Sequence, residues 1–344
     1  MSILDKILGH DDQLRTTPGK PDLMMQKVLD TLAELGGKPI ETLSPEEARR
    51  QPTPTDAVKK ILRETIKDED PTLGIQTRDI TIDGAAGPLQ ARIYSPDLDS
   101  TDLKPLVVYF HGGGFVIADL DVYDGGPRGL SRFADVVVLS VHYRQAPENK
   151  FPAAHDDATA AWKWALANAQ SIGGDPRKIA VAGESAGGNL AINVSIAARD
   201  QGLQAPAHQV LVYPLVGNDL NNESYVENAN AKPLNKAMIE WFVKHTFASE
   251  AETADPRVNV VGAANLAGLP SSTVITAEID PLRTEGQQLA EKLEAAGVDV
   301  RAKTFNGSTH EFFGMGLVVP DAAAAQTFAA HELKRAFGTA ILPI

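Results

Sequence analysis

From residue 105 onward the chain alternates apolar segments with amphipathic ones, and this alternation constrains the fold more than any other feature. Runs rich in Val, Ile and Leu occur at 105–110, 136–143, 178–183, 208–215, 272–279 and 298–305. Helical periodicity marks the segments 153–170, 186–200, 284–296 and 321–337. Strands that are apolar on both faces must be covered by helices on both sides, as in a mostly parallel sheet. The chain therefore predicts an α/β fold.

The segment before residue 105 has a different character. Residues 77–82 and 89–95 alternate polar and apolar side chains around a Gly-containing turn at 84–87, which predicts an antiparallel hairpin. Together with the six apolar runs, this hairpin gives a sheet of eight strands. Residues 21–35 and 53–66 place apolar side chains at helical spacing, and the prolines at 39, 45, 52 and 54 prevent one continuous helix.

Composition excludes several classes of protein. The 344-residue chain has no cysteine, so it can form no disulfide, thiolate zinc site or cysteine nucleophile. With 32 Lys and Arg against 45 Asp and Glu, its net charge is −13, which argues against a nucleic-acid-binding face. The opening residues lack a signal-peptide pattern because Asp5 and Lys6 interrupt a short apolar stretch, and no apolar run approaches a membrane span. We expect a cytoplasmic protein with no membrane span and no nucleic-acid partner.

A candidate nucleophile lies in the pentapeptide Gly183-Glu184-Ser185-Ala186-Gly187. This G-x-S-x-G pattern ends the apolar run 178–183 and opens the helical segment 186–200. A strand–turn–helix setting of this kind is what a nucleophile elbow needs, because the sharp turn lifts the serine hydroxyl above the sheet. The same string also fits a serine that only caps a helix, so the pattern needs further support.

A second candidate element, His111-Gly112-Gly113-Gly114-Phe115, follows the run 105–110. Consecutive glycines leave the backbone free to turn amide groups toward a developing oxyanion. A flexible turn after a strand is the alternative interpretation. A dinucleotide fingerprint is excluded because position 117 is isoleucine rather than glycine.

A serine nucleophile requires a base and an acid that follow it in the chain. His310 is the histidine after Ser185 that lies in a loop at the carboxyl end of a predicted strand, beyond an Asn-Gly turn at 306–307. His208 begins a strand, and His245 and His331 lie within helical patterns. We expect His310 to be the base.

Asp280 is the best candidate for the acid, because it ends the run 272–279 and is followed by Pro281. Asp219, which follows the run 208–215, is the second candidate. Asp255 follows no strand and is expected to begin a turn.

Six motifs in this order resemble the hormone-sensitive lipase family of α/β-hydrolases, the bacterial family IV esterases. They are HGGGF (111–115), YRQAPE (143–148), FPAAHDD (151–157), GESAGG (183–188), DPLRTEG (280–286) and HEFFGM (310–315). The resemblance covers about residues 75–340. It implies an α/β-hydrolase fold with Ser185 as nucleophile, His310 as general base and then acid, and Asp280 as orienting carboxylate.

The same resemblance implies an oxyanion hole formed by the amides of Gly113, Gly114 and Ala186. It implies a catalytic domain at 76–344 and a helical cap built from residues 1–75 and an insertion at about 217–250. A carboxylesterase for short-chain acyl esters follows, with a small ester as substrate, no cofactor or metal, and a possible homodimer. The alternatives are an amidase or other acyl hydrolase with the same triad, and a non-catalytic receptor like the plant gibberellin receptors, which lack a complete triad.

Two positions depart from the family pattern. Glu184 stands where Asp or Thr is common, and we expect the elbow geometry to hold with different buried partners. Gln145 stands where Leu is common, and we expect an effect on packing alone. In the insertion, Trp241 and Phe242 could either pack or line a substrate pocket, and both interpretations remain open. His155-Asp156-Asp157 lacks further ligands at metal spacing, so we expect a structural role for it.

Overall fold

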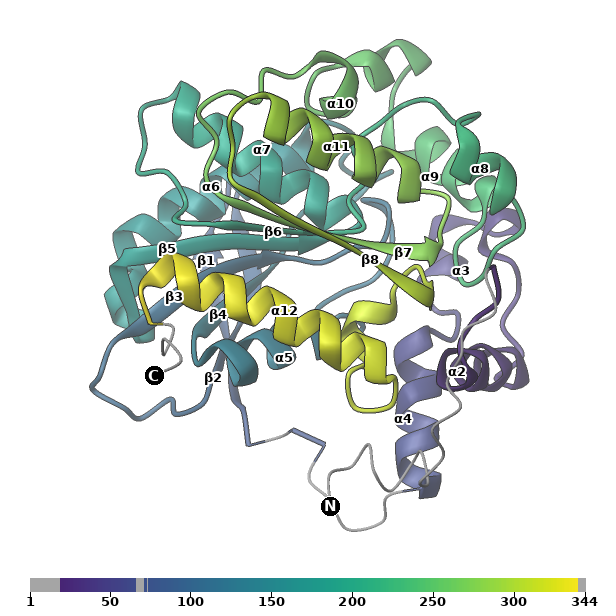
Figure 1. Cartoon of the computed structure of the whole chain (residues 1–344), viewed down its shortest axis with the longest axis horizontal. Helices are drawn as coiled ribbons and strands as arrows, with labels where there is room; N and C mark the ends of the chain where they lie inside the picture. The colour runs from purple at the N-terminus through teal and green to yellow at the C-terminus, as the bar shows by residue number, and fades with distance from the viewer. Residues whose placement is uncertain (1–18, 66–70, 73, 340–344) are drawn as a thin grey trace.

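The computed structural model describes residues 19–65, 71, 72 and 74–339, and an eight-stranded sheet lies at its centre (Figure 1). The prediction about the first residues of the chain lies outside this part. The strands are β1 (Gln76–Asp83), β2 (Pro88–Ser95), β3 (Lys104–Phe110), β4 (Val137–His142), β5 (Gly174–Glu184), β6 (Gln209–Val212), β7 (Ser272–Ile279) and β8 (Val300–Thr309). Their order in the sheet is β1-β2-β4-β3-β5-β6-β7-β8.

The predicted α/β fold is confirmed in its topology. Strand β2 pairs antiparallel with β1 and β4, and all the other pairs are parallel. Phe110 in β3 is the register partner of Gly183 in β5, and Ile279 in β7 is the partner of Thr309 in β8. The segments that follow β3 and β5 therefore leave the sheet side by side, as do those that follow β7 and β8. This register brings four distant parts of the chain to the same end of the sheet, where the parallel strands have their carboxyl termini.

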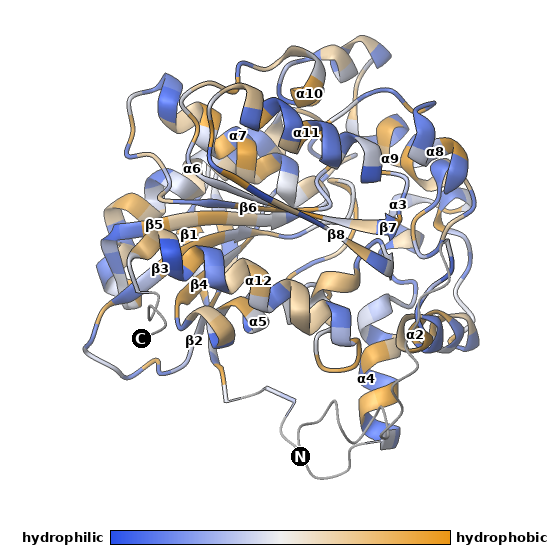
Figure 2. Cartoon of the chain, viewed as in Figure 1, coloured by the Kyte–Doolittle hydropathy of each residue, from blue (hydrophilic) through white to orange (hydrophobic). Residues whose placement is uncertain are grey.

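Helices cover both faces of the sheet. One apolar layer includes Trp162 of α6, Leu190 of α7 and Leu293 of α11, and the other includes Leu130 of α5 and Leu333 of α12. These helices are α5 (Gly125–Ala134), α6 (Ala153–Asn168), α7 (Ala186–Asp200), α11 (Arg283–Ala295) and α12 (Pro320–Phe337). In Figure 2 the central strand β5 is largely orange, whereas the edge strand β8 and helix α11 carry blue, as expected for elements at the outside. No helix of the described ranges has the length and apolar character that crossing a membrane requires.

Helix α5 is absent from the sequence-based prediction. Its sequence, GGPRGLSRFA, opens with glycines and proline, which have low intrinsic helix propensity. The helix forms because Leu130 and Ala134 are buried on the sheet side and α12 packs beside it. Tertiary packing here outweighs local propensity.

The end of β8 corrects another expectation. Residues 306–307, predicted as a turn before His310, belong to β8, which continues to Thr309. Gly307 has a φ of +70°, and its amide donates to the Glu278 carboxylate at 2.7 Å. The pairing of β7 with β8 shifts register between Ala277 and Ile279. The Asn-Gly pair therefore forms an irregularity within a strand.

Short helices lie beyond the carboxyl ends of the strands. They are α2 (Leu23–Glu34), η1 (Ile40–Thr42), α3 (Pro45–Ala48), α4 (Pro54–Thr65), α8 (Glu223–Glu227) and α9 (Lys236–Thr246). A third apolar cluster joins Ala48 of α3 to Ile239 and Trp241 of α9 and to Val116, in the loop after β3. The N-terminal segment and the segment around α9 are thus packed together over one edge of the sheet (Figure 1).

Candidate active site

Ser185, His310 and Asp280 form a continuous hydrogen-bonded chain. His310 Nε2 lies 3.0 Å from Ser185 Oγ, and His310 Nδ1 lies 2.7 Å from Asp280 Oδ2. The other oxygen of Asp280 accepts a hydrogen bond from the Leu282 amide at 2.9 Å. All three side chains are buried, with Asp280 fully so. The arrangement can carry the Ser185 proton to His310 while Asp280 fixes the imidazole tautomer.

The turn at Ser185 has the strained geometry of a nucleophile elbow. Ser185 has φ +57° and ψ −120°, which is unfavourable for a residue with a side chain. A Cβ on Gly183 would lie 2.1 Å from the carbonyl oxygen of Gly187, and one on Gly187 would lie 2.0 Å from that of Phe110. Only glycine fits at these two positions. The serine does not cap α7 through its side chain, so the capping interpretation of the pattern is wrong.

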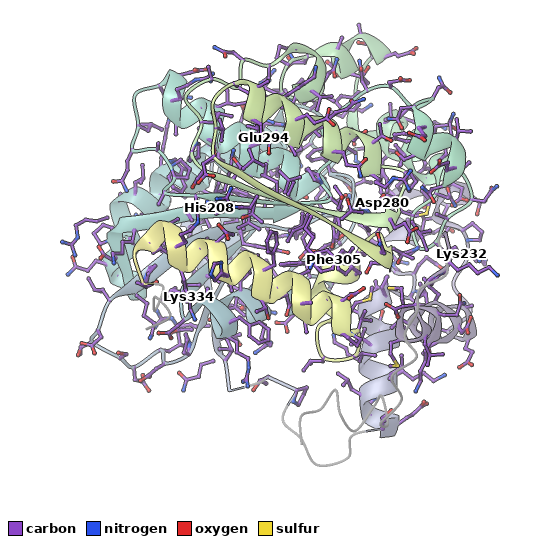
Figure 3. All side chains as sticks on the ribbon, in the orientation of Figure 1. His208, Lys232, Asp280, Glu294, Phe305 and Lys334 are labelled. Carbon is purple, nitrogen blue, oxygen red and sulfur yellow. The ribbon has the colours of Figure 1, made fainter. Side chains whose placement is uncertain are left out.

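The other histidines that follow Ser185 have ordinary structural partners. His208 hydrogen-bonds Ser271 Oγ at 2.7 Å and Thr273 Oγ1 at 2.8 Å, and Figure 3 shows it near the end of the sheet opposite Asp280. His245 packs against the Trp241 ring, with centroids 4.5 Å apart. His331 is exposed on α12.

The alternative acids also have other roles. Asp219 is exposed, and its carboxylate accepts a hydrogen bond from the Asn221 amide in a turn. Asp255 pairs with Arg257, and this hydrogen bond lowers the pKa of Asp255. Neither contacts His310.

The glycine loop (residues 111–118) lies beside the elbow. Gly113 and Gly114 have φ values of +101° and +59°, a conformation that glycine adopts without strain. Within the described ranges, neither their amides nor that of Ala186 donates to a protein acceptor. Ala186 is the first residue of α7, where an amide has no partner within the helix. Gly113 and Gly114 line the same cavity as Ser185, and Ala186 follows Ser185 in the chain, so the three amides are candidate donors to an oxyanion.

A buried carboxylate and two tyrosines lie beneath the elbow. The hydroxyls of Tyr109, at the end of β3, and Tyr213, after β6, both donate to Glu184. Burial raises the pKa of Glu184 to about 7 despite these bonds. The Tyr213 ring also packs against His310, with centroids 4.5 Å apart. These tyrosines are the buried partners of Glu184. Each lies near the carboxyl end of an apolar run, which marks it as a candidate, but periodicity does not pair it with Glu184.

Glu311 is another residue that the sequence analysis did not single out. It has φ +66°, and Tyr123 donates a hydrogen bond to its carboxylate at 3.1 Å. Burial raises the pKa of Glu311 above its ordinary value. Its position directly after His310 is the signal that could have marked it.

The pKa of His310 reflects two opposing effects. Burial lowers it, but the carboxylates of Asp280, Glu311 and Glu184 together outweigh burial and raise it above its usual value. A more basic imidazole accepts the serine proton more readily. Because its pKa is raised, the His310 imidazolium loses its proton at a higher pH than an ordinary histidine does.

A cavity of about 670 Å³ opens onto Ser185, His310 and the glycine loop. Its apolar lining comes mainly from α2, the segment around η1, and residues 230–242. Phe242 lines the cavity and closely approaches Gly114, where an added Cβ would lie 2.3 Å from its ring. Trp241 does not line the cavity, and its indole N–H donates to the Leu43 carbonyl at 3.0 Å. Of the two aromatic residues, Phe242 therefore lines the candidate substrate pocket, and Trp241 has a packing role.

Gln145 does more than the packing expected of it. Its amide nitrogen donates to the carbonyls of Ile117 and Ala118 at 2.7 and 2.9 Å, and its side chain lines the cavity. The expectation of a packing effect alone is therefore wrong, because a leucine could make neither hydrogen bond. Gln145 fixes the far end of the glycine loop.

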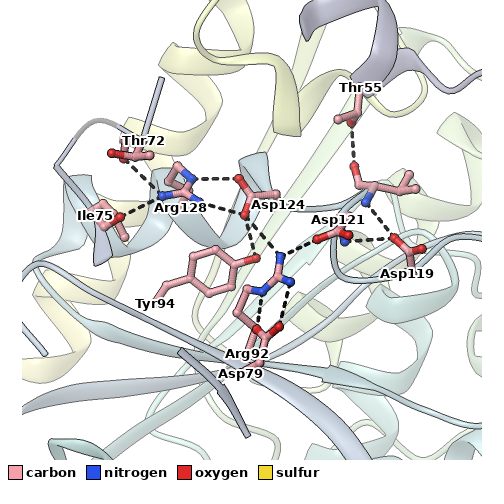
Figure 4. Close-up of polar contacts among 11 residues, drawn as sticks. Thr55, Thr72, Ile75, Asp79, Arg92, Tyr94, Asp119, Asp121, Asp124 and Arg128 are labelled. Carbon is pink, nitrogen blue, oxygen red and sulfur yellow. Dashed lines mark hydrogen bonds and ion pairs between the residues drawn. The ribbon is translucent and has the colours of Figure 1, made fainter. Parts of the chain in front are cut away.

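The turn at 119–124, which follows the glycine loop, is held by ion pairs (Figure 4). Arg92 of β2 donates to Asp79 at 2.6 and 3.1 Å and to Asp121 at 2.7 Å. Arg128 of α5 donates to both oxygens of Asp124 at 2.8 and 2.9 Å. The hydrogen bond from Arg92 lowers the pKa of Asp79. The network anchors this turn to the sheet.

The His155-Asp156-Asp157 segment has structural contacts. His155 Nε2 lies 2.8 Å from the Asn189 side-chain oxygen, and Asp157 pairs with Arg144 at 2.7 Å. Across the described ranges, no group of three or more His, Asp or Glu side chains is arranged to hold a metal ion.

Known proteins resemble this chain over most of its length. A family model described as the alpha/beta hydrolase fold matches residues 107–314. Carboxylesterase NlhH of Mycobacterium tuberculosis is 41% identical over 270 residues, which cover 77% of this chain and 84% of the relative. Ethyl acetate hydrolase of Pseudomonas putida is 33% identical over 309 residues, covering 88% and 94%. A solved structure, an esterase of Pyrobaculum calidifontis, has a TM-score of 0.78 and 35% identity over 90% of this chain and 98% of its own.

Proposed function

Because the chain belongs to the α/β-hydrolase family, we propose that it is a serine carboxylesterase that hydrolyses short-chain acyl esters. The resemblance to the hormone-sensitive lipase family is confirmed by its relatives. The observation that carries the proposal is the hydrogen-bonded chain from Ser185 through His310 to Asp280. The likeness to a protein named ethyl acetate hydrolase supports a short acyl group.

The first half of the reaction transfers the acyl group to the enzyme. Ser185 Oγ attacks the ester carbonyl carbon while its proton passes to His310 Nε2, 3.0 Å away. The negative charge that forms on the carbonyl oxygen accepts hydrogen bonds from the amides of Gly113, Gly114 and Ala186. The carbon–oxygen bond to the alcohol then breaks, and His310 gives its proton to the departing alkoxide.

The second half repeats these steps with water. His310 takes a proton from water, the resulting hydroxide attacks the acyl carbon, and the same three amides bind the oxyanion. The bond to Ser185 Oγ breaks, and His310 returns the proton to the serine. Asp280 stays ionised throughout and stabilises the imidazolium that forms twice in each cycle.

We propose that residues 1–75 and about 217–250 form a cap over this centre and that the remainder of 76–344 is the catalytic domain. Residues 1–18, 66–70, 73 and 340–344 of this division lie outside the part that the structure describes. This division is supported by the lining of the cavity, which includes side chains of α2, the η1 segment and α9. The N-terminal segment also holds the glycine loop and the turn at 119–124 that follows it. Arg49 Nε donates to the Val116 carbonyl at 2.9 Å, and Thr55 Oγ1 donates to the Val122 carbonyl at 2.6 Å. Arg49 is fixed in turn by two hydrogen bonds to Glu148, each 2.7 Å.

We further propose a cytoplasmic enzyme that forms a homodimer. The absence of cysteine fits a reducing compartment. Strand β8 is at the edge of the sheet, and an unpaired strand edge can pair with another chain. Sedimentation velocity of the purified protein tests the dimer, and a single monomeric species at micromolar concentration would contradict it.

The test of the catalytic proposal is hydrolysis of p-nitrophenyl esters from acetate to palmitate by the wild type, Ser185→Ala and Ser171→Ala. Ser171 is an exposed serine and serves as a matched control. We expect the wild type and Ser171→Ala to favour the short acyl chains, and Ser185→Ala to lose at least about 10³-fold in kcat. Activity that persists in Ser185→Ala would refute the nucleophile. Hydrolysis of p-nitroanilides but not of esters would favour an amidase.

A further inference from the structure

His111, the first residue of the glycine loop, and His142 form a hydrogen-bonded relay. His111 Nδ1 lies 2.7 Å from the Gly112 carbonyl oxygen, and His111 Nε2 lies 3.1 Å from His142 Nδ1. A carbonyl oxygen can only accept, so His111 Nδ1 carries the hydrogen. Burial, together with the neighbouring His142, lowers the pKa of His111 to about 3, which leaves its Nε2 as a lone-pair acceptor.

The relay fixes the tautomer of His142, the last residue of β4. Since His111 Nε2 accepts, His142 Nδ1 must donate to it. Burial lowers the pKa of His142 as well, so the neutral ring carries a lone pair on Nε2. Within the ranges that the structure describes, this nitrogen has no hydrogen-bond partner, and His142 lines the cavity that contains Ser185.

Two further acceptors line the same cavity. Asp119 Oδ1 accepts from the amides of Asp121 and Val122, each at 2.9 Å, while its Oδ2 has no partner in the described part of the chain. Gln145 uses its amide nitrogen on two backbone carbonyls, which leaves its Oε1 as an acceptor. His142 Nε2, Asp119 Oδ2 and Gln145 Oε1 form what we call the acceptor cluster.

The charges around the cavity narrow the chemistry of the ligand. A substrate anion would meet the carboxylates of Glu41, Asp119 and Glu311, all of which line the cavity. A substrate cation would meet Lys38 and Lys232, which line the cavity, and the Arg49 guanidinium, which also lines it. A neutral hydroxyl group avoids both repulsions, and its single hydrogen can be donated to one of these acceptors.

We propose that the acceptor cluster binds a hydroxyl group of the ester, so that hydroxylated esters are the substrate class of this enzyme. This inference rests on the proposed esterase function. The apolar lining from α2 and α9 holds the hydrocarbon part of the same substrate. The hydroxyl group belongs either to the alcohol portion or to the acyl portion, and the experiment distinguishes the two.

The test compares kcat/KM for two pairs of esters of nearly equal shape. The alcohol pair is 2-hydroxyethyl butyrate and propyl butyrate, and the acyl pair is ethyl 3-hydroxybutyrate and ethyl 3-methylbutyrate. In each pair one hydroxyl group replaces one methyl group. We expect the wild type to prefer the hydroxylated member of at least one pair, and that pair identifies the portion that reaches the cluster.

The variants remove one acceptor at a time. In His142→Asn, the side-chain amide nitrogen takes the place of Nδ1 and still donates to His111, but the Nε2 acceptor is lost. Asp119→Asn keeps Oδ1 for the two backbone amides and replaces Oδ2 with a donor. We expect the variant of the acceptor that takes the hydroxyl hydrogen to reduce the preference for the hydroxylated ester, about 3- to 10-fold for the neutral His142 and more than about 10-fold for the Asp119 carboxylate. His331→Asn, an exposed control on α12, should leave the preference unchanged.

Three results overturn the proposal. The first is equal kcat/KM within both pairs for the wild type, and the second is a preference that survives unchanged in both His142→Asn and Asp119→Asn. In either case, Ser185-dependent hydrolysis of propyl butyrate would leave the esterase function standing. The third is no hydrolysis of any of the four esters, which would refute the esterase function and this inference together.

Discussion

Replacing Gly113 with alanine tests the proposed oxyanion hole through its geometry. An added Cβ would lie 2.2 Å from the Ile117 carbonyl oxygen and 2.9 Å from its carbon. The Ile117 carbonyl cannot retreat freely, because Gln145 donates to it at 2.7 Å. The amides of Val116 and Ile117 both donate to the Gly113 carbonyl at 3.0 Å. The backbone of Gly113 must therefore move by about 1 Å to restore an ordinary contact.

That displacement removes one oxyanion donor from its working distance. Loss of one such donor costs about 10²- to 10³-fold in kcat, or about 2.7–4 kcal/mol of transition-state stabilisation. The free energy of unfolding falls as well. Alanine in a left-handed conformation costs about 1–2 kcal/mol, and overpacking against backbone costs about 1–3 kcal/mol more.

The assay is kcat for p-nitrophenyl butyrate together with urea-induced unfolding. Gly297→Ala is the matched control, because Gly297 also has a positive φ, +84°, but an added Cβ there meets nothing within 4 Å. It should lose only the conformational part of the stability and keep wild-type kcat. A folded Gly113→Ala protein with kcat within twofold of the wild type would refute the assignment of the Gly113 amide.

Four further predictions concern the residues around this centre. Asp280→Asn should lower kcat by about 10⁴-fold through loss of the correct tautomer, whereas Asp219→Asn should not, and the reverse result by ester assay would return the acid role to Asp219. Activity should fall as the pH drops through the raised pKa of His310, because only the neutral imidazole accepts the serine proton. Glu184→Gln, which removes a neighbouring carboxylate, should move this acid limb of kcat/KM to lower pH by up to about one unit, and an unmoved limb would contradict the electrostatic account. Arg49→Met should lower kcat and also change the acyl-chain preference, because Arg49 holds the glycine loop. An unchanged kcat in the ester assay would mean that Arg49 acts in the cap alone.

Much of this fold follows from hydrophobic periodicity. Apolar runs bounded by turn residues predicted the central strands within a few residues, and 186–200 coincides with α7. The prediction failed at α5, where the helix depends on packing against α12 rather than on its own residues. It failed again at Asn306-Gly307. An Asn-Gly pair is typical of a turn, but here it forms an irregularity within β8.

The three residues of the hydrogen-bonded chain could be predicted because the carboxyl end of a strand is visible in a sequence. Ser185, Asp280 and His310 each follow an apolar run, and strand order places those ends together. The buried partners could not be predicted in the same way. The contact of Glu184 with Tyr109 and Tyr213 depends on which faces of three neighbouring strands meet, and periodicity carries no such information.

Labelling with diethyl p-nitrophenyl phosphate tests the central claim most directly. This reagent transfers its phosphoryl group to an activated serine and releases one p-nitrophenolate for each adduct. We predict one adduct per chain, located on Ser185 by tandem mass spectrometry, with esterase activity lost in proportion and no adduct on Ser185→Ala. An adduct on another residue, or full activity in protein labelled completely at Ser185, would contradict the account.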